Sequence, residues 1–183
     1  MQTNKLLTAE KGFELYAFDF NALVDLIVTR YHYNLKDQAS LIYHLSNTLV
    51  RSDGYLYPHL SKLVDRFFVF FHDLLCQFKK EEQILFPNII HLAEKRLHER
   101  AFNYSTFGMV TEYAHKMKKQ HQAMLENLRA FRELTGDYKI IEGDCRSYML
   151  LMDKMKAFEK ELMEHIHLEN DVLIPKAIRL DEN

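Results

Sequence analysis

The stretch from residue 165 to residue 175 contains a histidine and a glutamate at a spacing that suits metal binding. His165 and Glu169 are four residues apart, so on a helix they lie on one face, one turn from each other. An imidazole and a carboxylate placed in this way can bind the same metal ion or pair of ions. Taken alone the motif is weak, because the chain has 10 histidines and a surface ion pair has the same spacing.

A near-repeat elsewhere in the chain strengthens the metal interpretation. The segment from Glu81 to Pro87 (EEQILFP) matches the segment from Glu169 to Pro175 (ENDVLIP), with a proline six residues after the glutamate in both. A proline inside a helix costs about 3 kcal/mol, so two prolines at equivalent places indicate a shared architectural rule. The residue that corresponds to His165 in the first copy is Gln77.

Four long helical patterns position these residues. Apolar side chains recur at helical spacing, and only 5 Gly and 3 Pro are available for turns, which favours a few long helices over many strands. Gly54 is expected to end the first helix, Pro58 suits the first turn of the second, Gly136 suits the end of the third, and Asp144 is expected to cap the fourth. The predicted helices cover residues 20–50, 58–97, 107–134 and 144–180.

Short connections between long helices place each helix beside its predecessor in antiparallel order. The sequence therefore predicts an all-α fold, an antiparallel up-down four-helix bundle over residues 20–183. Residues 1–19 have no strong period and are expected to form an arm or a short helix packed on the bundle. A chain of 183 residues has room for one such domain.

Two more histidines lie at matching depths in the remaining helices. In an antiparallel bundle, His32 of the first helix comes within a turn or two of the height of Glu81 in the second. The second helix continues beyond Glu81 for about as many residues as lie between the start of the third helix and His121. Glu81 and His121 are therefore expected at a similar height in the bundle. All four helices can therefore place a candidate ligand in one layer with His165 and Glu169.

These motifs resemble those of the RIC (repair of iron centres) proteins, which are hemerythrin-like di-iron proteins of bacteria. The resemblance spans residues 20–180. It implies a hemerythrin-like bundle with an oxo- or hydroxo-bridged di-iron centre, in which Glu81 and Glu169 are the bridging carboxylates. The implied metal ligands are His32, Glu81, His121, His165 and Glu169. The strings that carry the resemblance are TRYH at 29–32, KKEEQILFP at 79–87, QHQ at 120–122 leading into FRELT at 131–135, and HIHLENDVLIP at 165–175.

The chain departs from the family pattern at two places. The family has a histidine one turn before the first bridging glutamate, whereas this chain has Gln77, which is only a weak sixth candidate ligand. His72 lies about 140° further around the helix and cannot replace it. Longer family members also have an N-terminal domain with a cysteine pair. No cysteine precedes Cys76 here, so functions of that domain are not expected, whereas Cys145 resembles a family cysteine in the loop before the last helix.

The resemblance implies a role in the response to nitrosative or oxidative stress. The expected activity is the binding or reduction of nitric oxide, or the supply of iron for repair of damaged iron-sulfur clusters. NO or O₂ and iron-sulfur proteins are the expected partners. Imidazole and hard oxygen ligands suit iron and leave ligand positions open. Whether the chain is an enzyme stays open at this point.

Three other interpretations stay open as well. The bundle can be a module that senses O₂, NO or iron without turnover. It can be a ferritin-like iron store, although that chemistry needs two Glu-x-x-His motifs and only Glu112 to His115 has the spacing. It can also be a bundle whose metal site is weakened or lost because of Gln77.

Composition excludes several other classes of protein. The formal net charge is -2 and the 24 basic residues are scattered among 26 acidic ones, so no surface for nucleic acid is expected. Charged residues in the first twenty positions exclude a signal-peptide core, and no window approaches the roughly 18 apolar residues of a membrane span. Two cysteines are too few for a disulfide framework. A cytoplasmic protein is expected.

Several other residues have a non-metal interpretation. His167 pairs with Asp171 one turn on and faces away from the predicted site, and Cys76 is expected to be a buried thiol. Three tyrosines are expected to be core or boundary residues, namely Tyr31, Tyr113 and Tyr148. Four histidines without a carboxylate at matching depth are expected to face solvent or to be hydrogen-bonded, namely His44, His59, His91 and His98.

Overall fold

A computed structural model describes residues 19–97 and 109–182, and every regular element within these ranges is helical. The elements form four long rods. The first rod is α2 (Phe20–Leu26), the π-helical η1 (Ile27–His32) and α3 (Tyr33–Asp53). The second is α4 (His59–Lys80), η2 (Glu81–Leu85) and α5 (Phe86–Leu97). The third is α6 (Met109–Thr135), and the fourth is α7 (Arg146–Leu168), η4 (Glu169–Leu173) and α8 (Ile174–Glu182).

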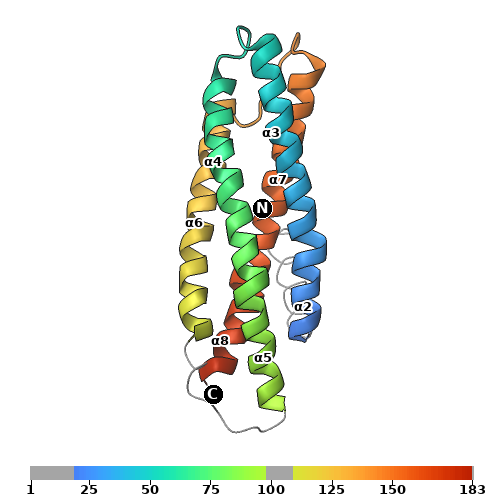
Figure 1. Cartoon of the computed structure of the whole chain (residues 1–183). Coiled ribbons are helices and arrows are strands. Elements are labelled where there is room, and N and C mark those ends of the chain that lie inside the picture. The colour runs from blue at the N-terminus through green and yellow to red at the C-terminus, as the bar shows by residue number, and fades with distance from the viewer. Residues whose placement is uncertain (1–18, 98–108, 183) are drawn as a thin grey trace, which may run out of the picture.

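The rods run alternately up and down, as Figure 1 shows. α3 packs beside both α4 and α7, and α4 packs beside α6. The predicted all-α up-down four-helix bundle is therefore confirmed. The expected arm at residues 1–19 falls almost wholly outside the described residues, as do His98 and the predicted start of the third helix at residue 107.

The helix ends agree with the predictions except at one cap. Gly136, directly after α6, has a φ of 59°, a left-handed conformation that glycine adopts without steric cost. The fourth rod starts with Cys145 as its cap residue, without a side-chain cap hydrogen bond. The prediction that Asp144 caps this helix was wrong, because its carboxylate accepts a hydrogen bond from the Ile141 N–H and closes the preceding turn instead.

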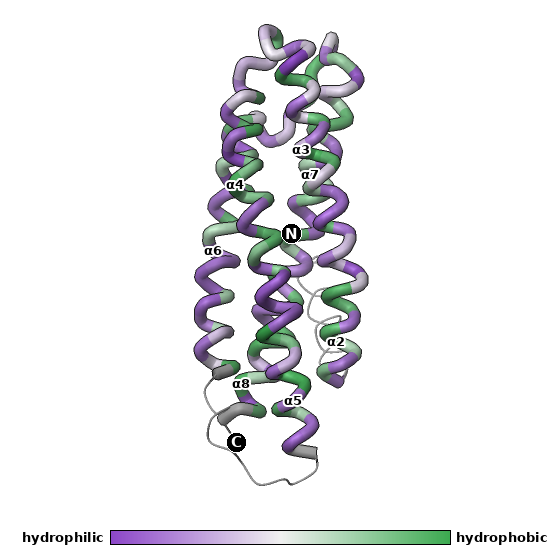
Figure 2. Tube along the Cα trace, viewed as in Figure 1, coloured by the Kyte–Doolittle hydropathy of each residue, from purple (hydrophilic) through white to green (hydrophobic). Residues whose placement is uncertain are grey.

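The core consists of two apolar clusters, one above and one below a buried polar layer. The upper cluster contains Phe67, Phe70 and Phe158, and the lower cluster contains Phe86 and Ile174. Figure 2 shows hydrophobic and hydrophilic residues alternating along each rod, the pattern of helices that bury one face. The polar residues between the clusters are the predicted site residues and Gln77, all of them 2% exposed or less.

Three π-helical turns interrupt the rods at the height of this layer. His32 ends the first turn, whereas Glu81 and Glu169 begin the other two. The N–H of Phe86 donates to the carbonyl of Glu81, five residues back, and the N–H of Ile174 donates to that of Glu169. Such wide turns are rare in helices, and many of those that do occur lie at functional sites.

The two repeated prolines explain two of these turns. Pro87 and Pro175 are each the second residue after a π-helical turn and have no N–H to donate. A proline ring also clashes with the carbonyl four residues back in an ordinary α-helix, and a widened turn upstream relieves that clash. The near-repeat in the sequence therefore corresponds to the same local backbone structure, a π-helical turn just before a proline, at two places in the chain.

Candidate metal centre

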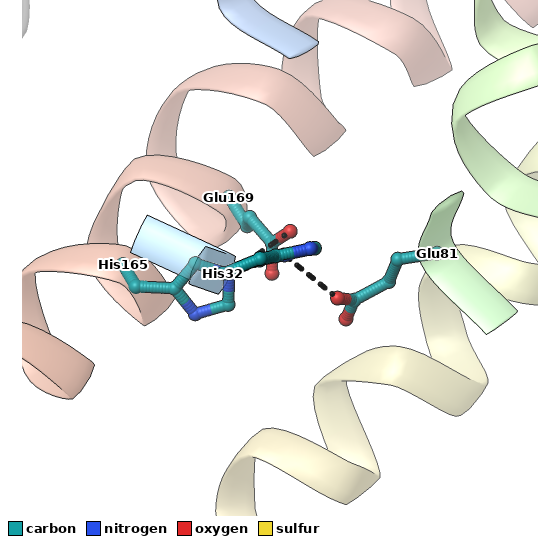
Figure 3. Close-up of side chains that lie close together, drawn as sticks. All are labelled: His32, Glu81, His165 and Glu169. Carbon is teal, nitrogen blue, oxygen red and sulfur yellow. Dashed lines mark hydrogen bonds and ion pairs between the residues drawn. The ribbon is translucent and has the colours of Figure 1, made fainter. Parts of the chain in front are cut away.

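The structure brings the five predicted ligands together from four rods. His32, Glu81 and His121 come from the first, second and third rods, while His165 and Glu169 come from the fourth. Figure 3 shows Glu81 pointing at the His32 ring, with the fourth-rod pair on the other side. One nitrogen or oxygen of His32, Glu81, His165 and Glu169 lies within 4.8 Å of each of the others, a cluster compact enough to hold a metal ion.

One side of the layer is formed by two imidazoles. The Nε2 atoms of His32 and His165 are 3.2 Å apart. Glu81 Oε2 is 3.3 Å from Nε2 of His32, and Glu169 Oε1 is 3.4 Å from Nε2 of His165. Two nitrogens and two carboxylate oxygens therefore converge here, and we call this group the first position.

The other oxygen of each carboxylate faces the third rod. Glu169 Oε2 is 3.1 Å from Nε2 of His121, and Glu81 Oε1 is 3.9 Å from the same nitrogen. The side-chain amide of Gln77 donates to Glu81 Oε1 at 2.7 Å. This group, the second position, has one imidazole where the first position has two. Both carboxylates lie between the two positions, which is the placement that a bridging carboxylate requires.

The His32 ring is held by groups that the sequence analysis did not identify. Its Nδ1 is 2.8 Å from Glu82 Oε1, and Lys36 Nζ donates to the same oxygen at 2.8 Å. The ring stacks on Phe78 at a centroid distance of 4.0 Å. A carboxylate on the far nitrogen of a histidine fixes its orientation and raises its basicity as a ligand.

The His121 ring is held in the same way. Its Nδ1 is 3.0 Å from Asn170 Oδ1. Asn170 directly follows Glu169, just as Glu82 directly follows Glu81, so the residue after each buried glutamate orients a histidine of a neighbouring rod. The sequence signal that could have identified both residues is their equivalent place in the near-repeat.

Burial and charge act against each other in this layer. Burial lowers the pKa of His32, but the nearby Glu81 carboxylate outweighs it, so the pKa is raised from its ordinary value. The pKa of His121 is raised in the same way, with Glu169 as the main partner opposing burial. Burial raises the pKa of Glu169, but the charge of His165 and the nearby imidazole of His121 hold it well below its usual range.

The polar atoms of the layer are not satisfied by protein groups. Glu81 Oε2, both carboxylate oxygens of Glu169 and His121 Nε2 are buried and make no hydrogen bond with any described residue. Buried carboxylates without partners are strongly destabilising unless a positive charge compensates them. Imidazole nitrogens and carboxylate oxygens that face one another are the ligands of a non-haem transition-metal site, so this donor set fits a bound cation.

The other candidate residues lie outside the layer. His167 is exposed and pairs with Asp171, as predicted. His72 is exposed on α4, and Glu112 pairs with Lys116 on the surface, so the ferritin-like Glu-x-x-His spacing builds no site here. The prediction that Cys76 is buried was wrong: its side chain is exposed, because it lies on the outer face of α4 while the next residue, Gln77, points inward.

The remaining predictions agree with the structure where it describes the residues. His44 and His91 are exposed, and the His59 ring nitrogen lies 3.2 Å from the hydroxyl of Tyr148. Tyr148 is buried in the upper cluster, while Tyr31 and Tyr113 are half-buried boundary residues. In residues 19–97 and 109–182, no helix is long and apolar enough to cross a membrane.

A buried layer of histidines and carboxylates inside an up-down four-helix bundle defines the hemerythrin-like class of metal-binding protein. The family described as the hemerythrin HHE cation binding domain matches residues 25–177, and the chain belongs to it. The matched range includes every residue of the polar layer.

Comparison with curated proteins finds iron-sulfur cluster repair proteins among those that the chain resembles. The chain is 29% identical over 157 residues to "Iron-sulfur cluster repair protein YtfE" of Yersinia pseudotuberculosis serotype IB (strain PB1/+) and to the protein of that name in Yersinia pestis (strain Pestoides F). Each alignment covers 86% of this chain and 65% of the relative, so the chain spans about two thirds of the relatives' length. The predicted resemblance to the RIC family is confirmed.

Metal binding is expected to weaken as the pH falls. His32 and His121 must lose their protons to bind a metal, and their raised pKa values mean that protons compete already above pH 6.5. The folding stability of the metal-free protein should depend on pH in the opposite direction. The protonated histidines stabilise the fold below pH 6.5, and this stabilisation is lost as the pH rises through their raised pKa values.

Competition with a chromophoric chelator between pH 8 and pH 6 measures the affinity, and thermal unfolding of the metal-free protein measures its stability. We expect the affinity for Fe²⁺ to fall by about tenfold or more per pH unit below the raised pKa values. The variant His167→Gln is the control and should keep the pH dependence, because His167 is exposed. An affinity independent of pH would exclude His32 and His121 as ligands.

The side chains that contact Nδ1 of His32 and His121 are expected to affect metal affinity almost as strongly as the histidines themselves. Glu82→Gln or Asn170→Ala should lower metal affinity by about 10- to 100-fold, because the first removes the negative charge beside Nδ1 of His32 and the second removes the hydrogen-bond partner of His121. Glu133→Gln, at an exposed position of α6, is the control. Unchanged affinity in both variants would show that the histidines are oriented by packing alone.

Proposed function

We propose that this chain is a non-haem di-iron protein of the response to nitrosative or oxidative stress. In this proposal it binds or reduces nitric oxide, supplies iron for the repair of damaged iron-sulfur clusters, or does both. Family membership supports the binding of a cation, and the printed name of the relatives supports a link to iron-sulfur cluster repair. The sequence-based expectation of a cytoplasmic protein belongs to the same proposal.

The placement of the two carboxylates is the observation that carries the di-iron assignment. Glu81 and Glu169 each direct one oxygen to the first position and the other to the second. A site for a single ion would need carboxylate oxygens at only one of the two positions. In the proposal His32 and His165 would hold one iron, His121 would hold the other, and the carboxylates of Glu81 and Glu169 would be shared between the two.

Bound iron would supply Lewis acidity and one-electron chemistry toward a small diatomic molecule such as NO or O₂. The protein residues would set how firmly each ion is held. The first position has two imidazoles, one of them oriented by Glu82, and is the firmer site. The second has one imidazole and the amide of Gln77, so iron there is easier to release or to approach. An iron that is more easily released or approached at the second position would suit a protein that donates iron or binds NO.

A transfer assay tests the proposal. The iron-loaded protein is incubated with an iron-sulfur enzyme inactivated by nitric oxide, and the recovery of the cluster is followed by its absorbance and by the enzyme's activity. We expect recovery with the wild-type protein and none with Glu169→Gln. Consumption of NO is measured in parallel with an electrode. A protein that binds two irons yet neither restores a cluster nor binds NO would contradict the proposed function and leave the metal site intact.

A further inference from the structure

An exposed cysteine and an exposed histidine lie one turn apart on the outer face of α4. The Sγ of Cys76 is 3.9 Å from both ring nitrogens of His72. The carboxylate of Asp73, also exposed, is 3.7 Å from Nδ1 of His72. Side chains four residues apart share one face of a helix, so the sulfur and the imidazole can reach the same point. All three side chains lie outside the buried layer.

A thiolate and an imidazole beside a carboxylate are suitable ligands for a divalent cation. Metal–sulfur and metal–nitrogen bonds of about 2.3 Å and about 2.0 Å place the two ligand atoms about 3.6 Å apart around a tetrahedral ion. The observed 3.9 Å between Cys76 and His72 is close to that spacing. Two protein ligands at an exposed place hold an ion weakly, which suits exchange rather than storage.

A cleft between the second and third rods runs inward from Cys76. It has a volume of about 260 Å³ and is lined by Asp73, Cys76, Gln77 and Met124, among others. Its walls belong to α4 and α6, which lie beside each other in Figure 1. At about 30 Å³ per water molecule, the cleft has room for a cation with part of its hydration shell. It therefore joins the exposed sulfur to the residue beside the second position.

The inner end of this cleft has a polar atom without a partner. Gln77 is 1% exposed, and its Oε1 makes no hydrogen bond with any described residue. Its Nε2 donates to Glu81 Oε1, one turn further along the rod, so Oε1 on the other branch of the amide faces the cleft. A buried amide oxygen without a partner is costly, and a cation or its bound water would satisfy it.

Charge distinguishes this cleft from a second one beside it. The second cleft, of about 230 Å³, also reaches Gln77 but is lined by Lys80 and Lys116, of which Lys116 pairs with a surface glutamate. The cleft at Cys76 shares Lys80 but has the carboxylate of Asp73 as well. Lysines oppose the entry of a metal cation, whereas a carboxylate raises its local concentration. The cleft at Cys76 is thus the one better suited to a cation.

We propose that Cys76 and His72 bind a divalent cation at the outer end of this cleft, and that Fe²⁺ passes between this pair and the second position. Binding forms one metal–sulfur and one metal–nitrogen bond, the thiol proton goes to solvent, and the metal keeps its oxidation state. The Oε1 of Gln77 is the ligand on the way. The passage rests on the proposed function, because it needs iron at the second position, whereas the surface pair does not.

Co²⁺ is the probe for the surface pair, because a cysteine sulfur bound to Co²⁺ gives a near-ultraviolet charge-transfer band that histidine and carboxylate ligands do not give. The metal-free protein is titrated with Co²⁺. We expect the band in the wild type and its loss in Cys76→Ser. His72→Gln should bind at least about tenfold more weakly, because loss of an outer partner alone costs that much.

Two variants serve as controls for the cobalt titration. Cys145→Ser removes the other cysteine of the chain, and His44→Gln removes an exposed histidine of α3. Both should keep the band and the affinity of the wild type. The absence of a band in the wild type, or a band that persists in Cys76→Ser, would overturn the proposed pair.

The rate of iron release tests the passage. The iron-loaded wild type, Cys76→Ser and Cys145→Ser are mixed with a chelator, and the release from the second position is followed. We expect Cys76→Ser to release this iron at least several-fold more slowly at unchanged iron content, and Cys145→Ser to match the wild type. Equal rates in all three would overturn the passage. A wild type with the cobalt–sulfur band but without iron at the second position would overturn the passage and the proposed di-iron function, and would support the surface pair.

Discussion

Replacing Glu169 by glutamine is expected to lower the affinity for iron by at least about a hundredfold, because loss of an outer partner alone costs 10- to 100-fold. Glu169 is fully buried, and its two oxygens face His165 on one side and His121 on the other. The substitution keeps the shape of the side chain but removes the charge that both positions share. Both irons should therefore be lost together. Iron content after dialysis against a chelator is the measurement.

Glu164→Gln is the matched control for this experiment. Glu164 is exposed on α7, one turn and a residue before Glu169, so the variant removes the same charge from the same helix without touching the buried layer. Circular dichroism of both variants shows whether the bundle still forms. If Glu169→Gln retains one iron as firmly as the wild type does, the shared role of this carboxylate is wrong.

Replacing Gln77 by histidine should have the opposite effect. Residue 77 is buried one turn before Glu81, and its amide already contacts a Glu81 oxygen that faces the second position. An imidazole there would complete the ligand set that the first position has. We expect the variant to hold two irons after dialysis, whereas the wild type should lose iron from the second position at least about tenfold faster.

The release of iron to a chelator, followed over time, measures this difference. Two phases are expected for the wild type and one slow phase for Gln77→His. Gln83→His adds a histidine at an exposed position of the adjacent π-helical turn and should behave as the wild type. Identical iron content and release kinetics in wild type and Gln77→His would mean that Gln77 does not set the asymmetry of the site.

The sequence was sufficient to predict the rods and the layer that they form. Apolar periodicity and the scarcity of glycine and proline predicted four helices, and the observed ends differ from the predicted ones by three residues or fewer where the structure describes them. The depth of His32 and His121 along their helices predicted a common height with Glu81. That reasoning works because rise per residue in a helix is fixed, so counting residues measures distance along the bundle.

Residue spacing could not predict how the layer is supported. Glu82 and Asn170 contact histidines 50 and 49 positions away in the chain, so their role depends on how neighbouring rods face each other. The π-helical turn that ends at His32 has no proline after it, and no feature of its sequence distinguished it from ordinary helix. Cys76 was misplaced because the second helix is apolar on most sides, which makes its outer face hard to recognise.

The metal content of the purified protein, measured together with its optical spectrum, shows whether the buried layer holds a di-iron centre. We expect two irons per chain after loading under air, with the near-ultraviolet bands of an oxo-bridged pair, and partial loss from one position on dialysis. A colourless protein that takes up no iron, while folding as the same bundle, would contradict this expectation. In that case the buried layer would be held together by protonated His32 and His121 against Glu81 and Glu169 alone.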